Sequence, residues 1–196
     1  MQLLHKPPVI SNHLLVTARQ VISPNQSSRQ QNNEVNLLVI HNISLPPGEF
    51  GGNFVDDLFC NCLDSSIHPF FTEIAQLRVS AHLLIDRDGK VTQYVPFNCK
   101  AWHAGESCFK GQNNCNDYSI GIELEGSDDT RFTDTQYDAL IKITGGLMKE
   151  YPAITPDRIV GHSDIAPGRK TDPGKFFDWS RYLDGIADLH KRQESS

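Results

Sequence analysis

Apolar residues gather in runs of strand length through the first two thirds of the chain. Residues 35–40 read Val-Asn-Leu-Leu-Val-Ile, and so few polar positions predict a strand that is buried on both faces, with His41 at its end. Residues 79–86 and 90–95 flank Arg87-Asp88-Gly89, and Asp-Gly between two apolar patterns is a strong signal for a hairpin. These segments predict part of a sheet.

A third segment has strict alternation. Residues 119–125 read Ser-Ile-Gly-Ile-Glu-Leu-Glu, in which small or acidic residues alternate with apolar ones. A period of two predicts a strand, because successive side chains of a strand point to opposite faces. Glu123 and Glu125 therefore share one face of the predicted strand.

Helical spacing is clearest in the last third of the chain. Residues 133–151 place apolar side chains three and four positions apart, and Thr133 with Gln136 forms a capping box at the predicted start. Gly145-Gly146 weakens this helix by about 1 kcal/mol for each glycine relative to alanine. Residues 178–190 predict a final amphipathic helix. Its apolar side consists of Trp179, Tyr182, Leu183, Ile186 and Leu189.

The remaining segments are polar or rich in turn-forming residues. Residues 23–34 contain no large apolar side chain, and we expect a polar surface loop that contributes nothing to the core. Residues 43–66 predict a long loop of the kind that forms lids or binding walls, and residues 68–77 predict a short helix. Strands interspersed with helices, including an antiparallel hairpin, predict an α/β fold with a mixed β-sheet flanked by helices.

Composition narrows the class of protein. A chain of 196 residues is most simply one domain spanning 1–196, and it can bury about 70% of its unfolded surface. The net charge of -6 gives no electrostatic reason to bind a polyanion, so we expect no nucleic-acid partner. No apolar run has the length of a membrane span or of a signal-peptide core. Five cysteines, an odd number, favour a reducing compartment. We expect a cytoplasmic monomer without a membrane partner and with unpaired cysteines.

The densest group of reactive side chains lies in residues 159–174. His162, Asp164, Lys170 and Asp172 are separated there by Pro and Gly residues that prevent a continuous helix and predict an ordered loop. Imidazole nitrogen and carboxylate oxygen are ligands of catalytic zinc, which usually takes three ligands from the protein. The sequence therefore offers His162 and Asp172 as two candidates for a zinc site.

Histidines outside this loop have alternative interpretations. A lone histidine at the end of an apolar strand, such as His41, is more often a hydrogen-bonded structural residue than a metal ligand. His82 lies inside an apolar run and is expected to be a hydrogen-bonded core residue, whereas His103 is a candidate for a cleft. Asp164 is expected either to cap the loop or to orient His162.

Several motifs, taken in order, carry a family resemblance over about residues 36–182. The sequence is similar to the zinc-dependent N-acetylmuramoyl-L-alanine amidases, and it is most similar to the cytoplasmic branch that acts on 1,6-anhydro-muropeptides. The motifs are LVIHNISLPPGEFGG (38–52), LRVSAHLLI (77–85), AWHAG (101–105), DYSIGIELEG (117–126) and GHSDIAPGRKTDPG (161–174).

The resemblance implies a fold, a cofactor and a reaction. The fold is the mixed sheet flanked by helices that these amidases share with the peptidoglycan recognition proteins. One Zn²⁺ per chain is implied, with His41, His162 and Asp172 as ligands, Glu123 as the essential proton carrier and Lys170 as the active-site cation. The implied reaction is hydrolysis of the amide between N-acetylmuramic acid and L-alanine in muropeptide recycling. An indirect influence on β-lactamase induction is also implied.

The resemblance also implies contacts to a small muropeptide substrate. The implied substrate-binding residues are Asn42, Arg78, Ala101, Trp102 and His103. The guanidinium of Arg78 suits a stem-peptide carboxylate, because it can donate two parallel hydrogen bonds. This chain departs from close relatives at Asn114, where they often have Arg. Either recognition of the diaminopimelate end of the stem peptide is then weaker, or Lys110 or Arg131 replaces that contact.

Two other classes of function remain open at this point. Some relatives bind peptidoglycan without cutting it, typically after the loss of a metal ligand, whereas here every implied ligand position, Glu123 and Lys170 are filled. An exported amidase or phage endolysin would require a signal, a wall-binding domain or a holin partner, and the sequence gives no sign of a signal or a wall-binding domain. We therefore expect a catalytic protein that acts on soluble turnover products.

Overall fold

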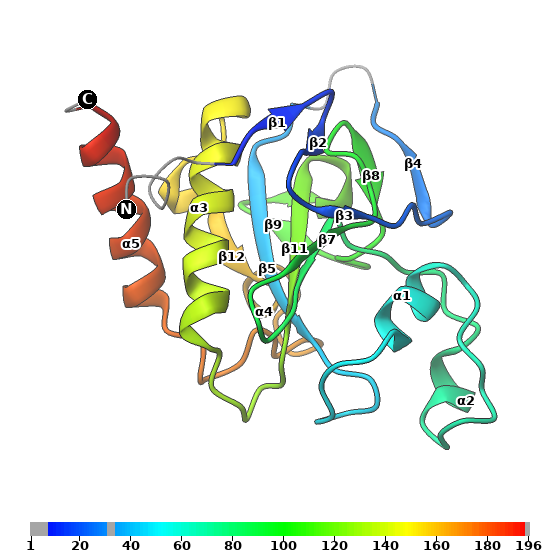
Figure 1. Cartoon of the computed structure of the whole chain (residues 1–196). Coiled ribbons are helices and arrows are strands. Elements are labelled where there is room, and N and C mark those ends of the chain that lie inside the picture. Colours follow the sequence, from blue (N-terminus) through cyan, green and yellow to red (C-terminus); the bar gives the residue numbers. More distant parts are fainter. Residues whose placement is uncertain (1–7, 31–33, 195–196) are drawn as a thin grey trace.

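A mixed sheet of six strands runs through the middle of the protein (Figure 1). The computed structural model describes residues 8–30 and 34–194. Neighbouring strands of the sheet are parallel except for β6 and β7, which form the antiparallel hairpin predicted from the Asp-Gly turn. The predicted class, a mixed sheet flanked by helices, is confirmed. From one edge to the other the strands are β12 (Ile159–Gly161), β5 (Leu37–Ile43), β11 (Ser119–Glu125), β6 (Leu83–Ile85), β7 (Val91–Gln93) and β3 (Arg19–Gln20).

The central strands β5 and β11 are buried along most of their length. Residues 37–41 of β5 and all residues of β11 are buried, as expected for strands covered on both faces. The bounds predicted for β11 are those observed. The prediction for β5 was wrong at its end, because the strand continues to Ile43 and His41 lies inside it rather than after it. Pairing of residues 41–43 with β11 extends the strand beyond its apolar run.

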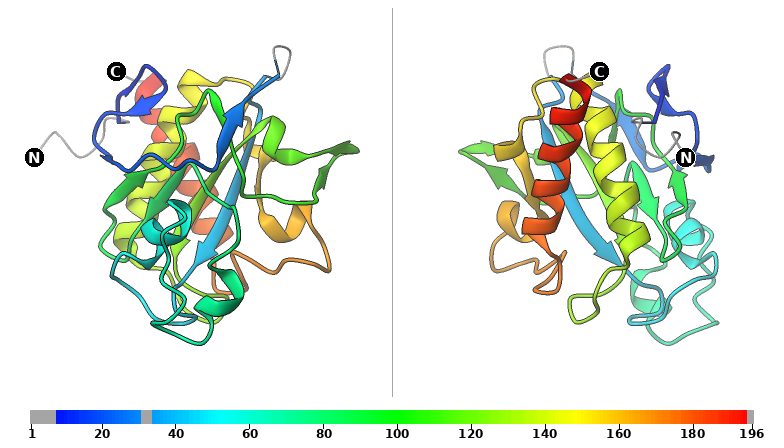
Figure 2. Two further views of the ribbon diagram at one scale, coloured as in Figure 1. Left: turned by 90° about the vertical axis from the view of Figure 1, so that its right-hand side faces the viewer. Right: turned by 60° about the vertical axis from the view of Figure 1, so that its left-hand side comes forward.

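Two long helices cover one face of the sheet (Figures 1 and 2). They are α3 (Asp134–Glu150) and α5 (Trp179–Glu194), close to the predicted bounds, and α3 begins with the predicted capping box at Thr133. Gly145 is buried, and a Cβ there would collide with Leu189 of α5. The glycine that weakens α3 by itself therefore allows the two helices to approach closely.

The largest apolar cluster lies between these helices and the sheet. It contains alternate residues of the central strands, such as Ile40, Ile122 and Leu124, together with Leu140 and Tyr182 from the helices. Since successive strand residues face opposite sides, the residues between them face away from α3 and α5. Histidine and glutamate at those positions therefore lie on the opposite face of the sheet.

Short elements and loops cover that opposite face. Two smaller apolar clusters flank its centre, one around Phe59, Phe71 and Tyr94 and the other around Val39 and Tyr118. The predictions for this region were partly wrong: the expected loop 43–66 contains a helix, and the expected helix 68–77 shortens to one turn. The helices are α1 (Phe54–Phe59) and α2 (Phe71–Ile74). Two 3₁₀ turns, η1 (Cys115–Asp117) and η2 (Pro156–Arg158), also occur in the protein.

The remaining strands form two-stranded pairs outside the main sheet. They are β1 (Ile10–Ser11) with β2 (Leu14–Leu15), β4 (Gln26–Ser28) with β8 (Cys99–Ala101), and β9 (Cys108–Phe109) with β10 (Gln112–Asn113).

Residues 23–34 are not the surface loop that their polarity predicted. Ser23 and Asn25 are buried, and β4 pairs with β8. The Arg29 guanidinium donates to the backbone oxygens of Asn116, Asp117 and Ser119, so this segment is attached to the polar interior through hydrogen bonds. Hydrophobic patterning does not detect such attachment. Residues 31–33 of the predicted loop lie outside the described residues.

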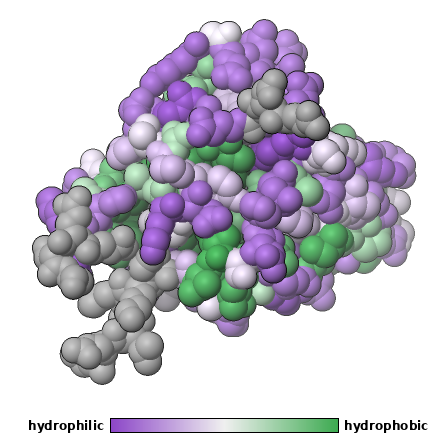
Figure 3. All heavy atoms as spheres, turned by 90° about the horizontal axis from the view of Figure 1, so that it is seen from above, coloured by the Kyte–Doolittle hydropathy of each residue, from purple (hydrophilic) through white to green (hydrophobic). Residues whose placement is uncertain are grey.

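On the face seen from above, hydrophilic side chains predominate, with separate apolar patches among them (Figure 3). Among the described residues, no helix combines the length and the apolar character needed to cross a membrane. All the cysteines, Cys60, Cys62, Cys99, Cys108 and Cys115, are free thiols. The expectation of unpaired cysteines is confirmed.

Candidate functional site

Strand register brings the candidate residues together on the face away from α3 and α5. His41 of β5 is the register partner of Glu123 on β11, and Ile40 is the partner of Gly161 at the end of β12. His162 follows Gly161 directly. Three adjacent strands thus deliver His162, His41 and Glu123 in one row across the sheet.

Three ligand atoms converge at this position. Nδ1 of His41 lies 3.0 Å from Nδ1 of His162 and 3.0 Å from Oδ2 of Asp172, and the last two atoms are also 3.0 Å apart. Ligand atoms bound tetrahedrally to zinc at about 2.0–2.1 Å lie roughly 3.3 Å from one another. The geometry and the chemistry of this donor set therefore fit a zinc ion.

The segment that supplies two of these atoms is more regular than the predicted loop. Its first residues complete β12, and α4 (His162–Ile165) follows as a single helical turn, so the prediction of a loop throughout 159–174 was wrong. Asp164 Oδ2 accepts a hydrogen bond from the Gly161 backbone N at 2.7 Å and caps this turn. The Ser163 backbone N donates to the Asp172 backbone O at 3.0 Å, which ties the two ligand-bearing positions together.

Glu123 is the one described residue with a buried side-chain polar atom that has no hydrogen-bond partner. Its carboxylate is buried, and Oε2 is the unpartnered atom. Burial, and next the negative charge of Asp172, raise the pKa of Glu123 well above that of an ordinary glutamate, while Lys170 opposes the shift. A carboxyl group with a raised pKa and a vacant lone pair is suited to accept and return a proton.

The electrostatic environment favours a neutral His41 beside a charged Asp172. Burial lowers the pKa of His41 to about 4, and the hydrogen bond that His41 donates to Asp172 when protonated opposes that change. Burial also acts to raise the pKa of Asp172, but its contacts with His162 and His41 outweigh burial and hold that pKa below the ordinary value. A neutral imidazole and an ionised carboxylate are the forms that bind a metal.

Around these groups lies a cleft of about 230 Å³, and Lys170 lines it together with Asn42, Trp102 and His103. The Lys170 side chain forms no hydrogen bond or ion pair within the described part of the chain. Its positive charge acts to lower the pKa of both His41 and Glu123. The structure therefore brings together all the predicted metal and catalytic positions.

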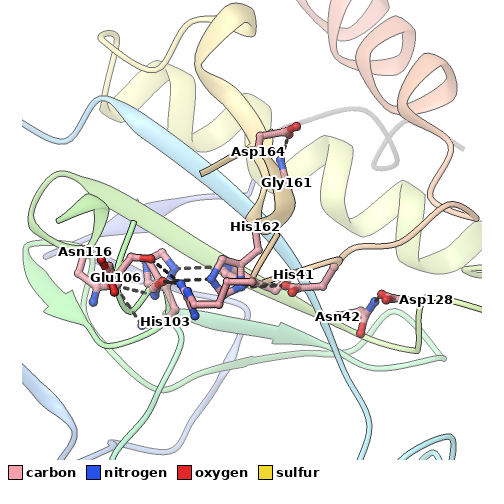
Figure 4. Close-up of polar contacts among 12 residues, drawn as sticks. His41, Asn42, His103, Glu106, Asn116, Asp128, Gly161, His162 and Asp164 are labelled. Carbon is pink, nitrogen blue, oxygen red and sulfur yellow. Dashed lines mark hydrogen bonds and ion pairs between the residues drawn. The ribbon is translucent and has the colours of Figure 1, made fainter. Parts of the chain in front are cut away.

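The predicted substrate contacts divide into those that reach the cleft and those that do not. Ala101 is 0% exposed, and the exposed side chain of Arg78 donates to the backbone oxygens of Gln76 and Leu77, so neither lines the cleft. Asn42 and His103 line it but are already engaged. Asn42 donates to Asp128 Oδ1 at 2.7 Å and points away from the histidines, whereas His103 lies next to His41 (Figure 4).

The candidates for a contact replacing the relatives' arginine at position 114 are engaged elsewhere. Asn114 has a left-handed backbone with a φ of 59° at the start of η1. Lys110 Nζ pairs with Asp157, and the Arg131 guanidinium stacks on Phe176. Neither side chain lines the cleft around the ligand atoms.

Two supporting residues, Asn116 and Ser119, were missed at the level of sequence. Asn116 Oδ1 accepts from the backbone N of both His103 and Ala104. Ser119 contacts His103. The alternation in β11 already places Ser119 on the face of Glu123, but no pattern in the sequence signals the role of Asn116.

Comparison with known proteins gives consistent matches over most of the chain. The family model described as N-acetylmuramoyl-L-alanine amidase matches residues 31–175. The 1,6-anhydro-N-acetylmuramyl-L-alanine amidase AmpD of Haemophilus influenzae is 57% identical over 177 residues, which cover 90% of this chain and 96% of that protein.

Solved structures agree with the sequence matches. A crystal structure of a selenomethionine derivative of AmpD superimposes with a TM-score of 0.89 at 52% identity, covering 91% of this chain and 99% of that one. The amidase AmiD from E. coli, in complex with the substrate anhydro-N-acetylmuramic acid-L-Ala-D-γ-Glu-L-Lys, matches with a TM-score of 0.58 at 31% identity. That match covers 80% of this chain and 60% of AmiD.

Proposed function

The chain belongs to the N-acetylmuramoyl-L-alanine amidase family and is an amide hydrolase, and on this premise we propose the details of its chemistry. We propose that it is a zinc-dependent enzyme which hydrolyses the amide between 1,6-anhydro-N-acetylmuramic acid and the L-alanine of the stem peptide. The observation that carries the proposal is the convergence of His41, His162 and Asp172 within 3.0 Å of one another, beside the unpartnered carboxylate of Glu123.

The proposed ligands are His41, His162 and Asp172. A zinc ion held there would supply Lewis acidity, lower the pKa of water and polarise the scissile carbonyl. The protein prepares both imidazoles for this role by burial, which keeps His41 neutral, and by hydrogen bonding, since His162 Nε2 donates to the Ala104 backbone O at 3.1 Å. The lone pair on His162 Nδ1 then faces the other two ligand atoms.

Glu123 and Lys170 carry the proposed proton transfer and charge stabilisation. Glu123 takes a proton from the attacking water through its vacant carboxylate oxygen and later delivers it to the departing amine of L-alanine. Lys170 lines the same cleft and has no competing protein partner among the described residues, so its ammonium group is available to the oxygen on which negative charge develops. No covalent intermediate is needed.

The proposed substrate is a soluble, small anhydro-muropeptide in cell-wall recycling. Identity of 57% to an amidase named for the 1,6-anhydro sugar, over nearly the whole of that protein, supports this choice over intact murein. Asn42 and Trp102 line the cleft where the sugar or the first peptide residue would sit. Both ring nitrogens of His103, which also lines the cleft, already contact protein partners. Arg78 and Ala101 enter the proposal as contacts made at the rim or through the backbone.

The physiological setting is part of the proposal. We expect the enzyme to be a single-domain monomer, spanning residues 1–196, that works in the cytoplasm without a membrane or nucleic-acid partner. By removing anhydro-muropeptides it would also influence β-lactamase induction indirectly.

The substrate class can be tested by comparing two substrates under the same conditions. The purified protein is incubated with zinc and either anhydro-muropeptides or intact sacculi, and the released peptides are measured by mass spectrometry. We expect rapid release from the anhydro-muropeptides alone. Release from sacculi at a comparable rate would contradict the recycling assignment, and binding of either substrate without release would favour the binding-module alternative.

A further inference from the structure

A chain of polar contacts continues from the back of His41 into the interior. Nε2 of His41 lies 2.9 Å from Nδ1 of His103, and Nε2 of His103 lies 3.0 Å from Oγ of Ser119. His41 is 1% exposed and Ser119 is 0% exposed, so both ends of this series of contacts are shielded from bulk water. Figure 4 shows His103 beside His41 on the same face of the sheet.

The other imidazole ligand has a fixed tautomer. His162 Nε2 lies 3.1 Å from the Ala104 backbone O, and a carbonyl oxygen can only accept a hydrogen bond. His162 therefore carries its proton on Nε2 and presents a lone pair on Nδ1. The outer nitrogen of His41 faces another imidazole instead, and a neutral imidazole can either donate or accept. The tautomer of His41 thus depends on the tautomer of His103.

Two proton arrangements satisfy the same heavy-atom geometry. In the first, the Ser119 hydroxyl donates to His103 Nε2, His103 Nδ1–H donates to His41 Nε2, and His41 Nδ1–H points to the ligand position. In the second, His41 Nε2–H donates to His103 Nδ1, and His103 Nε2–H donates to the Ser119 oxygen. The proton count is identical, since each ring moves its proton from one nitrogen to the other. Only the second arrangement leaves a lone pair on His41 Nδ1 for a metal.

Electrostatics selects between the two arrangements. Without a cation, the second arrangement places two nitrogen lone pairs and the Asp172 oxygen 3.0 Å from one another, which is repulsive. The first arrangement relieves this repulsion by donating the His41 Nδ1 proton to Asp172. A cation among the three atoms reverses the preference. The contacts from His41 to His103 and Ser119 must therefore be able to form in both arrangements. The Ser119 hydroxyl allows this because it can either donate or accept a hydrogen bond.

Building on the zinc centre proposed above, we propose that His103 and Ser119 are positioning residues that let His41 change tautomer when zinc binds. Both ring nitrogens of His103 are occupied, one by His41 and the other by Ser119, so the ring is not free to bind the substrate. Gly121 makes room for it, because a Cβ at that position would lie 2.5 Å from His103 Cγ.

The first test measures zinc affinity by competition with a chromophoric chelator. His103→Leu and Ser119→Ala remove a partner that the metal-binding arrangement needs, and we expect each to weaken zinc binding by about 10–100-fold. His103→Asn offers an amide near the position of Nδ1 that can accept or donate, so its affinity should stay near that of the unchanged protein. Thr144→Val also removes a buried hydroxyl, but one on α3 that contacts Tyr182 of α5, and serves as the matched control.

The second test needs no variant. Nitrogen-15 NMR of the histidines in the full chain reads each tautomer with and without zinc. We expect His41 and His103 to carry their protons on Nδ1 without zinc and on Nε2 with it, while His162 keeps its proton on Nε2 throughout. A His103 tautomer that does not respond to zinc would overturn the inference, as would equal affinities of His103→Leu and the unchanged protein. Failure of the unchanged protein to bind zinc would overturn the proposed function and this inference with it.

Discussion

The two faces of the sheet are made by the same strands but have opposite chemistry. Toward α3 and α5, β11 presents Ile120, Ile122 and Leu124, which join a continuous apolar cluster. Toward the cleft, the same strand presents Glu123, whose carboxylate is buried without a partner for one oxygen. The helix-covered face stabilises the fold. The cleft face lowers stability, because its buried carboxylate and converging ligand atoms are electrostatically unfavourable until a metal and substrate bind.

The largest expected difference between the two faces comes from replacing the proton carrier with a side chain of the same shape. Glu123→Gln should lower the rate of amide hydrolysis by about 10²–10⁴-fold, because the amide side chain cannot take up the proton of the attacking water. Zinc content, measured by elemental analysis, should be unchanged since Glu123 is not a proposed ligand. A near-normal rate would remove Glu123 from the mechanism.

The converse change deletes apolar volume one residue away on the opposite face. Ile122 is 0% exposed within the apolar cluster, so Ile122→Ala should lower the free energy of unfolding by about 2–5 kcal/mol through lost burial and a cavity. Chemical denaturation measures this loss. Below the unfolding transition, zinc stoichiometry should be retained, and loss of zinc from a fully folded variant would show that the two faces are not separable in this way.

A smaller effect connects function with stability on the cleft face. In the metal-free protein, Glu123→Gln should raise the free energy of unfolding at pH 7 by about 1–3 kcal/mol, because it removes the cost of a buried, incompletely paired carboxylate. The pKa of Glu123 is raised in the folded state, so the folded protein holds this proton more tightly than the unfolded chain does. Stability of the parent protein relative to the variant therefore falls as pH rises through the raised pKa.

This sign can be checked by repeating the denaturation at several pH values. Below the ordinary glutamate pKa of about 4.3, the carboxyl is protonated in both states, and the pH-dependent advantage of the variant should vanish. An advantage that stays constant with pH would mean that ionisation of Glu123 is not its cause.

The smallest effect is expected from a polar pair within the helix-covered face. Thr144 Oγ1 and Tyr182 Oη are 2.6 Å apart and buried between α3 and α5. Tyr182→Phe should cost about 1 kcal/mol of stability, typical of one buried hydrogen bond, and should leave kcat/KM unchanged. A change in kcat/KM would indicate coupling between the helices and the cleft.

The difference between the faces also explains how far the sequence predicts this structure. The helices α3 and α5, the hairpin and β11 were predicted because their apolar residues follow a helical or strand period. Residues 23–28 were mispredicted because backbone pairing and buried hydrogen bonds, such as those of Ser23 and Asn25, leave no apolar pattern. The helix α1 does bury Val55, Leu58 and Phe59 at helical spacing, but it is only six residues long and was missed within the expected loop.

In the site, too, some residues were predicted from sequence patterns, whereas the roles of others depend on contacts that only the folded structure shows. His162 and Asp172 were identified as candidate ligands from the residue types in 159–174, and the family motifs added His41 and Glu123. Strand register accounts for the proximity of His41, Glu123 and His162. The role of His103 depends on its contact with His41, and the role of Asn116 depends on its contact with the backbone of Ala104. Both contacts join different segments of the protein, and no local spacing in the sequence predicts them. Arg78 and Ala101, taken from the same motifs, do not line the cleft.

The central claim is that the cleft face holds one zinc ion and uses it to cleave a single amide. Elemental analysis of the purified protein, paired with mass spectrometry of an anhydro-muropeptide digest, tests it most directly. We predict one zinc per chain, loss of activity on chelation with recovery on adding zinc, and two products that together gain one water at the bond between the sugar and L-alanine. A metal-free preparation that cleaves this bond at the same rate, or cleavage at another bond, would contradict the account.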